Sequence, residues 1–294
     1  MNKVNPGNIG EEPRERSVQC ASPSGLHRMA YREWGDPQNP KVLVCVHGLT
    51  RNSLDFERLA QSLSTHYRVI APDVVGRGES DCLIDPMGYN TFTYAADMIT
   101  LVAKLGVEQV DWLGTSMGGL IGMMLAGQPK SPIRRMILND VGPTLSLEAL
   151  KRIVGYVGEP YEFADVAAAR RYVRLIFTPF ALQTESDWDA LIDSTLKPTA
   201  SGGMRFNYDR NINKPLQQAL LGQDINLWPI YDRIQCPTLL IRGGLSDLLS
   251  VETAAEMCRR GPKATLKVVE NVGHAPMFMS ADQIALVRDF LELA

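Results

Sequence analysis

A five-residue stretch, Gly-Thr-Ser-Met-Gly at residues 114–118, joins a short apolar run to a run of helix-forming residues. A serine at so tight a strand-to-helix corner takes strained backbone angles, and glycines on either side let neighbouring backbone pass close by. The hydroxyl of Ser116 is then held up into a cleft. Backbone N–H groups at the start of the helix point to the same place, where they can stabilise negative charge. The stretch predicts one half of an acyl-transfer site.

The other half requires a base and an acid, because a serine hydroxyl is a poor nucleophile at neutral pH. Residues 237–247 indicate a short buried strand running into a loop that contains Asp247. Residues 264–269 alternate as a strand does, and the loop after them contains His274. The order serine, acid, histidine therefore predicts Ser116 as the nucleophile, His274 as the base and Asp247 as the acid.

Asp140 is a second position for the acid, at the end of a predicted strand over residues 134–139. Aspartate commonly shapes turns, and a turn through Gly142 and Pro143 follows directly. On the order of the motifs we favour Asp247.

The oxyanion that forms during acyl transfer needs backbone donors. An apolar strand over residues 41–46 ends in His47-Gly48-Leu49. The backbone N–H groups of Leu49 and Met117 are expected to bind the oxyanion together. We interpret His47 as ordering this loop through hydrogen bonds, because His274 already fills the base position.

Strand and helix patterns alternate along most of the chain, which argues for a parallel sheet covered by helices on both faces, with ligands at the carboxyl ends of the strands. Between residues 143 and 235 the pattern becomes helical and aromatic.

We predict a mobile tail over residues 1–15, a core over 16–142 and 236–294, and an inserted helical cap over 143–235. The core strands are expected at residues 16–20, 27–34, 41–46, 67–71, 110–113, 134–139 and 264–269, and the core helices at 53–64, 91–105, 117–128 and 283–293.

Composition excludes several classes of function. The chain has 294 residues, 45% hydrophobic and 21% charged, which is enough for one large core. A net charge of −3 provides no basic stripe for nucleic acid. No apolar stretch is long enough for a membrane span, and residues 1–17 have no apolar centre of a signal peptide, so a cytoplasmic protein is expected. The five cysteines are odd in number and scattered, which favours reduced thiols.

Four residues are candidates for contact with a substrate. Phe177, Phe180 and Trp188 belong to the aromatic-rich segment that we expect to set substrate choice. Arg51 follows the oxyanion loop closely and could bind a substrate carboxylate in a bidentate manner. A surface ion pair with Asp55 is the preferred interpretation of Arg51.

The chain resembles the α/β-hydrolase superfamily, in the cap-bearing branch of bacterial esterases, lactonases and carbon–carbon bond hydrolases. The resemblance rests on five motifs in order: His-Gly-Leu at 47–49, Pro-Asp-Val-Val-Gly-Arg-Gly-Glu-Ser-Asp at 72–81, Gly-Thr-Ser-Met-Gly-Gly at 114–119, Ser-Asp at 246–247 and Gly-His-Ala-Pro at 273–276. It implies an α/β fold with a mostly parallel eight-stranded sheet flanked by helices and an inserted helical cap. Haloalkane dehalogenases and epoxide hydrolases of this fold have aspartate at the nucleophile position, so Ser116 disfavours an alkyl-enzyme mechanism.

The resemblance implies a serine hydrolase that cleaves a carboxylic ester or lactone of a small to medium, partly apolar substrate through an acyl-enzyme. It implies no metal or organic cofactor, and it does not indicate an oligomeric state. Carbon–carbon bond hydrolysis of a ring-cleavage dienoate, or cofactor-free perhydrolysis, would use the same three groups and stays open. A non-catalytic ligand receptor is a third hypothesis, but such receptors usually lack one of the three groups, and none is missing here.

Overall fold

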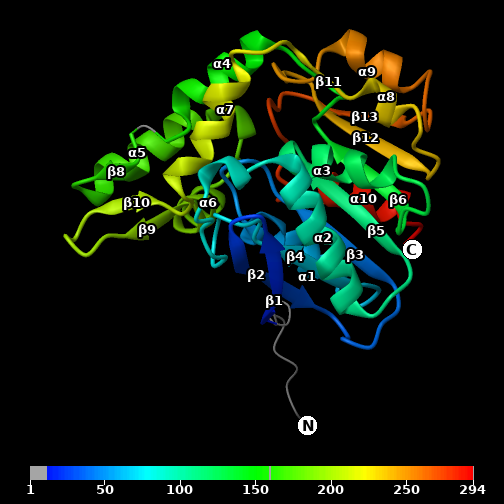
Figure 1. Cartoon of the computed structure of the whole chain (residues 1–294), viewed down its shortest axis with the longest axis horizontal. Helices are drawn as coiled ribbons and strands as arrows, with labels where there is room; N and C mark the ends of the chain where they lie inside the picture. Colours follow the sequence, from blue (N-terminus) through cyan, green and yellow to red (C-terminus); the bar gives the residue numbers. More distant parts are fainter. Residues whose placement is uncertain (1–11, 159, 294) are drawn as a thin grey trace.

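The computed structural model of the chain describes residues 12–158 and 160–293. Its centre is one eight-stranded sheet (Figure 1). The strands lie side by side in the order β1 (Arg14–Ser22), β2 (Gly25–Trp34), β4 (Arg68–Pro72), β3 (Val42–Val46), β5 (Val110–Thr115), β6 (Ile133–Asn139), β12 (Thr238–Gly243) and β13 (Thr265–Val269). Only the pairs β1–β2 and β2–β4 are antiparallel in this sheet. The predicted mostly parallel, eight-stranded α/β fold is confirmed.

Helices cover both faces of the sheet, because the central strands are apolar on both sides. In β3, Val42, Val44 and Val46 face one apolar cluster, and Leu43 and Cys45 face the other. Helices α2 (Thr91–Leu105), α3 (Met117–Ala126) and α9 (Val251–Met257) pack in the first cluster; α1 (Glu57–Leu63) and α10 (Ala281–Phe290) pack in the second. Short 3-10 turns η1 (Ser53–Phe56) and η2 (Pro86–Gly88) precede α1 and α2. The predicted core elements are all present, with their ends within three residues of the predicted ends, except that the first four residues of the helix predicted over 53–64 form η1.

The segment between β6 and β12 leaves the sheet, and most of it lies together on one side of the sheet (Figure 1). It is mainly helical, as predicted, but it also contains short strands that pair as β8-β10-β9 and β11-β7. Runs of two or three residues are too short for alternation to reveal them in the sequence. The elements are β7 (Thr144–Leu145), α4 (Leu147–Tyr156), β8 (Glu162–Phe163), α5 (Val166–Ile176), η3 (Thr178–Phe180), α6 (Glu185–Thr195), β9 (Leu196–Pro198), β10 (Met204–Phe206), η4 (Arg210–Ile212), α7 (Asn213–Ala219), β11 (Ile225–Asn226) and α8 (Trp228–Tyr231).

The structure bears on the predicted end of the N-terminal tail, but it does not test the predicted division into core and cap. Residues 1–11 of the predicted tail lie outside the described residues, and Arg14 and Glu15 already belong to β1, so the tail was predicted too long. The division into a core and a cap domain stays a prediction. None of the helices in the described part of the chain is long and apolar enough to cross a membrane.

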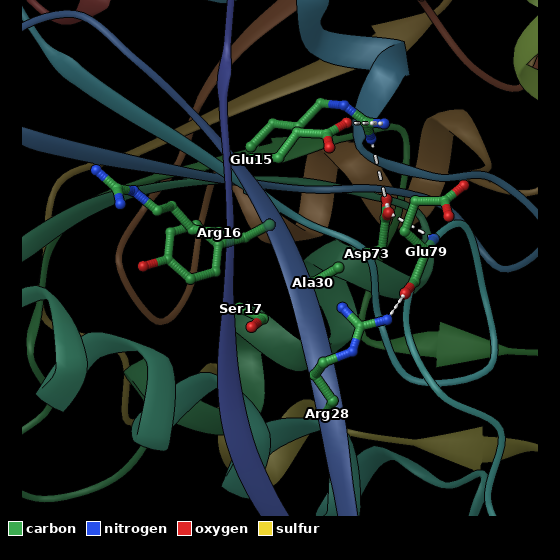
Figure 2. Close-up of a pocket in the computed structure, with 9 residues that line it drawn as sticks. Glu15, Arg16, Ser17, Arg28, Ala30, Asp73 and Glu79 are labelled. Atoms are coloured by element: carbon green, nitrogen blue, oxygen red, sulfur yellow. Dashed lines mark hydrogen bonds and ion pairs between the residues drawn. The ribbon is translucent and has the colours of Figure 1, made fainter.

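A polar groove of about 320 Å³ follows the β1–β2 hairpin, and Figure 2 shows the side chains that line it. The buried carboxylate of Asp73 accepts hydrogen bonds from the backbone N–H groups of Ser53 and Glu79, at 2.8 and 2.9 Å. Arg32 reaches both Asp73 and Glu15, at 3.6 and 3.5 Å. These charged groups pair with one another, and their contacts hold the hairpin against the loop after β4.

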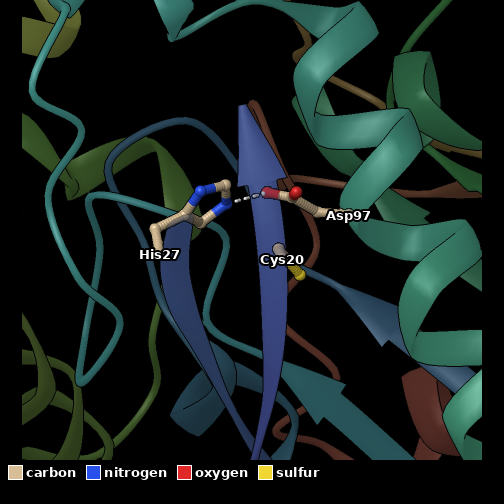
Figure 3. A group of neighbouring side chains, drawn as sticks. All are labelled: Cys20, His27 and Asp97. Carbon is tan, nitrogen blue, oxygen red and sulfur yellow. Dashed lines mark hydrogen bonds and ion pairs between the residues drawn. The ribbon is translucent and has the colours of Figure 1, made fainter. Parts of the chain in front are cut away.

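His27 lies in a buried cluster with Cys20 and Asp97 (Figure 3). Cys20 and His27 are cross-strand partners in β1 and β2, and Asp97 comes from α2. His27 Nε2 is 2.9 Å from Asp97 Oδ2. Burial raises the pKa of Asp97, and the hydrogen bond to His27 acts in the opposite direction. This contact ties the antiparallel hairpin to the helix that covers it.

Replacing His27 with alanine leaves the carboxylate of Asp97 buried without its partner, a change that costs about 3–5 kcal/mol in comparable sites. Because the folded pKa of Asp97 is already raised and the substitution raises it further, the folded variant binds a proton that the unfolded chain has lost. The stability of His27→Ala, measured by urea unfolding, should therefore fall as the pH rises above the ordinary pKa of an aspartate, about 4.

The matched control is His66→Ala, at a partly exposed histidine, which should lose about 0.5 kcal/mol or less. Equal losses in the two variants would show that the contact between His27 and Asp97 does not stabilise the fold.

Candidate active site

Ser116 occupies the turn between β5 and α3, with φ of 52° and ψ of −114°. A non-glycine residue is strained there. The flanking glycines make the turn possible: a Cβ on Gly114 would lie 2.2 Å from the carbonyl oxygen of Gly118, and one on Gly118 would lie 2.0 Å from that of Val46. The predicted strand, turn and helix are present, and the serine is held at the carboxyl end of a central strand.

His274 connects Ser116 to a carboxylate. It lies in the loop after β13, and its Nε2 is 2.9 Å from Ser116 Oγ. Its Nδ1 is 2.8 Å from Oδ2 of Asp140, which directly follows β6. The imidazole can therefore take the serine proton at Nε2 while the carboxylate holds the N–H at Nδ1 and offsets the charge that develops.

The structure corrects the prediction of the acid. Asp247 lies on an exposed loop after β12, and its carboxylate pairs with Arg152 at 3.2 Å instead of with His274. Asp140 is fully buried, and its other oxygen accepts a hydrogen bond from the backbone N–H of Gly243 at 2.9 Å. Both aspartates follow neighbouring parallel strands, so motif order cannot tell which one faces the histidine. We favoured a turn-forming role for Asp140, but its carboxylate also contacts His274 and the backbone of Gly243.

Asn139, which sequence reasoning missed, joins the three loops of the site. Its backbone carbonyl accepts from the N–H of Ser116 at 3.0 Å. Its buried side-chain amide donates to Thr115 Oγ1 at 3.0 Å and to the carbonyl of Pro276 at 2.8 Å. The residue before the acid thus fixes both the serine turn and the histidine loop. The signal available in the sequence was an asparagine at the end of a predicted strand, directly before a candidate acid.

His47 orders the loop that contains Leu49, as expected. Its Nε2 accepts from the backbone N–H of Val74 at 2.9 Å, so the ring proton is on Nδ1, which donates to the carbonyl of Gly48 at 2.7 Å. That carbonyl belongs to the same peptide plane as the N–H of Leu49. Burial lowers the pKa of His47 to about 4, so the ring stays neutral in this role. The oxyanion role of Leu49 and Met117 stays a prediction.

Arg77 contacts both segments that contain those predicted donors, the loop after β3 and the start of α3. Its side chain is almost fully buried and donates to the carbonyl of Leu49 at 2.8 Å and to the hydroxyl of Tyr94 at 2.9 Å. Its Nη2 lies 3.6 Å from Met117 Sδ. The guanidinium therefore anchors the loop after β3 to the start of α3.

A pocket of about 280 Å³ opens above Ser116 and His274, and it shares no lining residue with the groove of Figure 2. Phe177 and Phe180 line it with their rings 4.9 Å apart, as their predicted role requires. Trp188 does not line it, because its ring packs under the guanidinium of Arg174 at 5.4 Å. The prediction for Trp188 is corrected accordingly.

Arg51 lines the pocket, but its guanidinium already has partners. It forms the predicted ion pair with Asp55, which is buried instead of on the surface, with Nε 3.0 Å from Oδ1. It also donates to the hydroxyls of Ser194 and Thr195 at the end of α6. Arg51 therefore links the loop after β3 to the inserted segment, and these contacts leave its guanidinium little capacity for a substrate carboxylate.

The rate at which a fluorophosphonate reagent modifies Ser116 tests the choice of acid. We expect Asp140→Asn to slow the reaction by roughly 10³- to 10⁴-fold, because the imidazole loses the carboxylate that fixes its tautomer. Asp247→Asn, the matched control, should react within about twofold of the wild type. The assignment is wrong if Asp247→Asn is the slower of the two variants while both retain the wild-type circular dichroism spectrum.

Known proteins resemble this chain over nearly its whole length. The model of the family described as alpha/beta hydrolase fold matches residues 41–281. A 3-hydroxybutyrate-oligomer hydrolase from Cupriavidus necator is 47% identical over 289 residues, which cover 96% of this chain and 99% of that protein. Among solved structures, an alpha/beta hydrolase from Novosphingobium aromaticivorans has 37% identity and a TM-score of 0.84, over 96% of this chain and 98% of that one. A putative hydrolase from Rickettsia typhi has 32% identity and a TM-score of 0.86, over 95% and 99%. With this match in sequence and in fold, the chain belongs to the α/β-hydrolase family.

Proposed function

We propose that this α/β-hydrolase cleaves the ester bonds of short oligomers of 3-hydroxybutyrate or of closely related 3-hydroxy acids. The observation that supports an acyl-transfer mechanism most directly is the hydrogen-bonded series Ser116–His274–Asp140 beneath a pocket, with 2.9 and 2.8 Å between the bonded atoms. The similarity to a 3-hydroxybutyrate-oligomer hydrolase at 47% identity supports the choice of substrate.

In the proposed mechanism, Ser116 Oγ attacks the ester carbonyl while His274 Nε2 takes its proton. The N–H groups of Leu49 and Met117 stabilise the oxyanion, and His274 then returns the proton to the leaving alkoxide. The acid half of the ester stays bound to Ser116 until water, activated by the same imidazole, releases it. Asp140 keeps the Nδ1 proton in place throughout and offsets the positive charge of the imidazolium.

The pocket suits a short, partly apolar chain. Its walls include the aliphatic side chains of Ile153 and Ile176 and the rings of Phe177 and Phe180, which match the methyl and methylene groups of a hydroxybutyrate unit. A volume of about 280 Å³ is at the lower end for small-molecule sites. A few units fit such a space, and a long polymer segment would extend outside it.

The first test measures release of 3-hydroxybutyrate from its linear dimer and trimer by chromatography, beside a p-nitrophenyl butyrate and a simple lactone. Ser116→Ala should lower kcat by on the order of a thousandfold or more on every substrate that the wild type cleaves. Ser201→Ala, at an exposed serine, is the control and should retain the wild-type rate. A Ser116→Ala variant within tenfold of the wild type would remove Ser116 from the mechanism. Failure of the wild type on the dimer and trimer, with p-nitrophenyl butyrate cleaved, would reject the proposed substrate alone.

The second test concerns chain length. Truncating Phe177 and Phe180 together to alanine removes apolar surface from the pocket and should change the ratio of kcat/KM between long and short acyl esters by about 1–3 kcal/mol equivalent. Trp188→Ala, outside the pocket, should leave that ratio unchanged. Equal ratios in the double variant and the wild type, with unchanged circular dichroism, would show that the two rings only pack against their neighbours.

A further inference from the structure

The rim of the active-site pocket holds a second arginine, Arg152, that differs from Arg51 in its surroundings. Arg51 is buried, and Asp55, Ser194 and Thr195 occupy its guanidinium. The side chain of Arg152 is 46% exposed. Of the two cations that line the pocket, Arg152 is therefore the one that a ligand can reach.

Within the part of the chain that the structure describes, Arg152 pairs with one exposed residue, Asp247. Its Nη2 lies 3.2 Å from both the carboxylate and the backbone carbonyl of Asp247, whose side chain is 61% exposed. An exposed pair of this kind contributes about 0–1 kcal/mol, so another carboxylate can replace Asp247 at small cost. When a substrate carboxylate replaces that of Asp247, the positive charge of the Arg152 guanidinium still has a negative partner.

Tyr156 supplies a second donor beside Arg152. The two residues are one turn apart on α4 and lie on the same face of the helix, which faces the pocket. Within the described residues the Tyr156 hydroxyl has no hydrogen-bond partner, unlike the hydroxyls of Tyr161 and Tyr208 nearby. Burial raises the pKa of Tyr156 to about 12, so the phenol keeps its proton and can donate it in a hydrogen bond.

Linear oligomers of a 3-hydroxy acid present a matching group. Their last ester bond is followed, after a short carbon chain, by a free carboxylate, so a substrate bound with that ester at Ser116 places a negative charge a few ångströms farther along the pocket. A planar guanidinium binds a carboxylate in a bidentate manner, and a neighbouring phenol can add a third hydrogen bond.

We propose that Arg152, together with the Tyr156 hydroxyl, binds the terminal carboxylate of the substrate, so that the enzyme selects linear hydroxy-acid oligomers with a free acid end over neutral esters. This inference rests on the proposed ester hydrolysis at Ser116. Asp247, predicted from the sequence as the catalytic acid, then acts as the exchangeable partner that holds Arg152 when the pocket is empty.

The test compares the linear dimer of 3-hydroxybutyrate with its methyl ester, which differ only in the terminal charge. Arg152→Gln should lower kcat/KM for the acid dimer by about tenfold or more, mainly through KM, and leave the methyl ester within about twofold. Tyr156→Phe should show a smaller loss with the same selectivity. Asp247→Asn removes the competing carboxylate and should raise kcat/KM for the acid dimer alone. Arg259→Gln is the matched control, because Arg259 is exposed and ion-paired and is not among the residues that line the pocket.

The outcomes separate this inference from the proposed function. If the wild type cleaves both forms of the dimer and Arg152→Gln leaves the ratio of their kcat/KM values unchanged, the carboxylate site is rejected and ester hydrolysis stands. An equal loss on both forms would show a structural role and would also reject the site. If the wild type cleaves p-nitrophenyl butyrate but neither form of the dimer, the proposed substrate and the carboxylate site are rejected together. A higher inhibition constant for free 3-hydroxybutyrate in Arg152→Gln is the expected equilibrium counterpart of the kinetic result.

Discussion

The hydrogen bond between His274 and the buried carboxylate of Asp140 is the contact on which the arrangement of the site depends. It joins the loop after β13 to the end of β6, and so brings two distant parts of the chain to Ser116. A buried carboxylate is costly unless its oxygens are satisfied, and here the second oxygen accepts from the backbone of Gly243 at the end of β12. The acid is thus held by the same sheet that supports the nucleophile, which leaves the imidazole little freedom to turn away.

Other buried polar side chains hold the turns and loops around the site through hydrogen bonds to their backbone. Asn139 holds the serine turn and the histidine loop, His47 orients the peptide plane of Leu49, and Arg77 joins the loop after β3 to α3. Each of these side chains meets several neighbours at hydrogen-bond distance in the interior, where such bonds are stronger than in water and where an unpaired group is expensive. The backbone around Leu49 and Met117 is thereby held in one arrangement, which the predicted oxyanion role of their N–H groups would require.

Two arginine–aspartate pairs of opposite character lie where the inserted segment meets the active-site pocket. Arg51 and Asp55 are buried, and with the hydroxyls at the end of α6 they hold the segment beside the loop after β3. Arg152 and Asp247 are exposed and pair only at the rim of the pocket. Burial makes the first pair structural, since breaking it leaves a charge without compensation, and exposure makes the second pair exchangeable.

Local signals in the sequence determined the fold class, the strand-to-helix turn at Ser116, the identity of His274 and the ends of most core elements, because apolar periodicity and glycine turns depend on neighbouring residues. The choice between Asp140 and Asp247 was decided only by the tertiary structure. Both follow adjacent parallel strands, and the direction in which each loop leaves the sheet places Asp140 in the interior and Asp247 on the surface. The tertiary structure also decided the place of Trp188, whose ring packs against Arg174 instead of lining the pocket. It likewise decided that Arg152 lines the pocket, because that position depends on packing between segments far apart in the chain. Spacing along a chain indicates which groups are available, and long-range packing decides which of them meet.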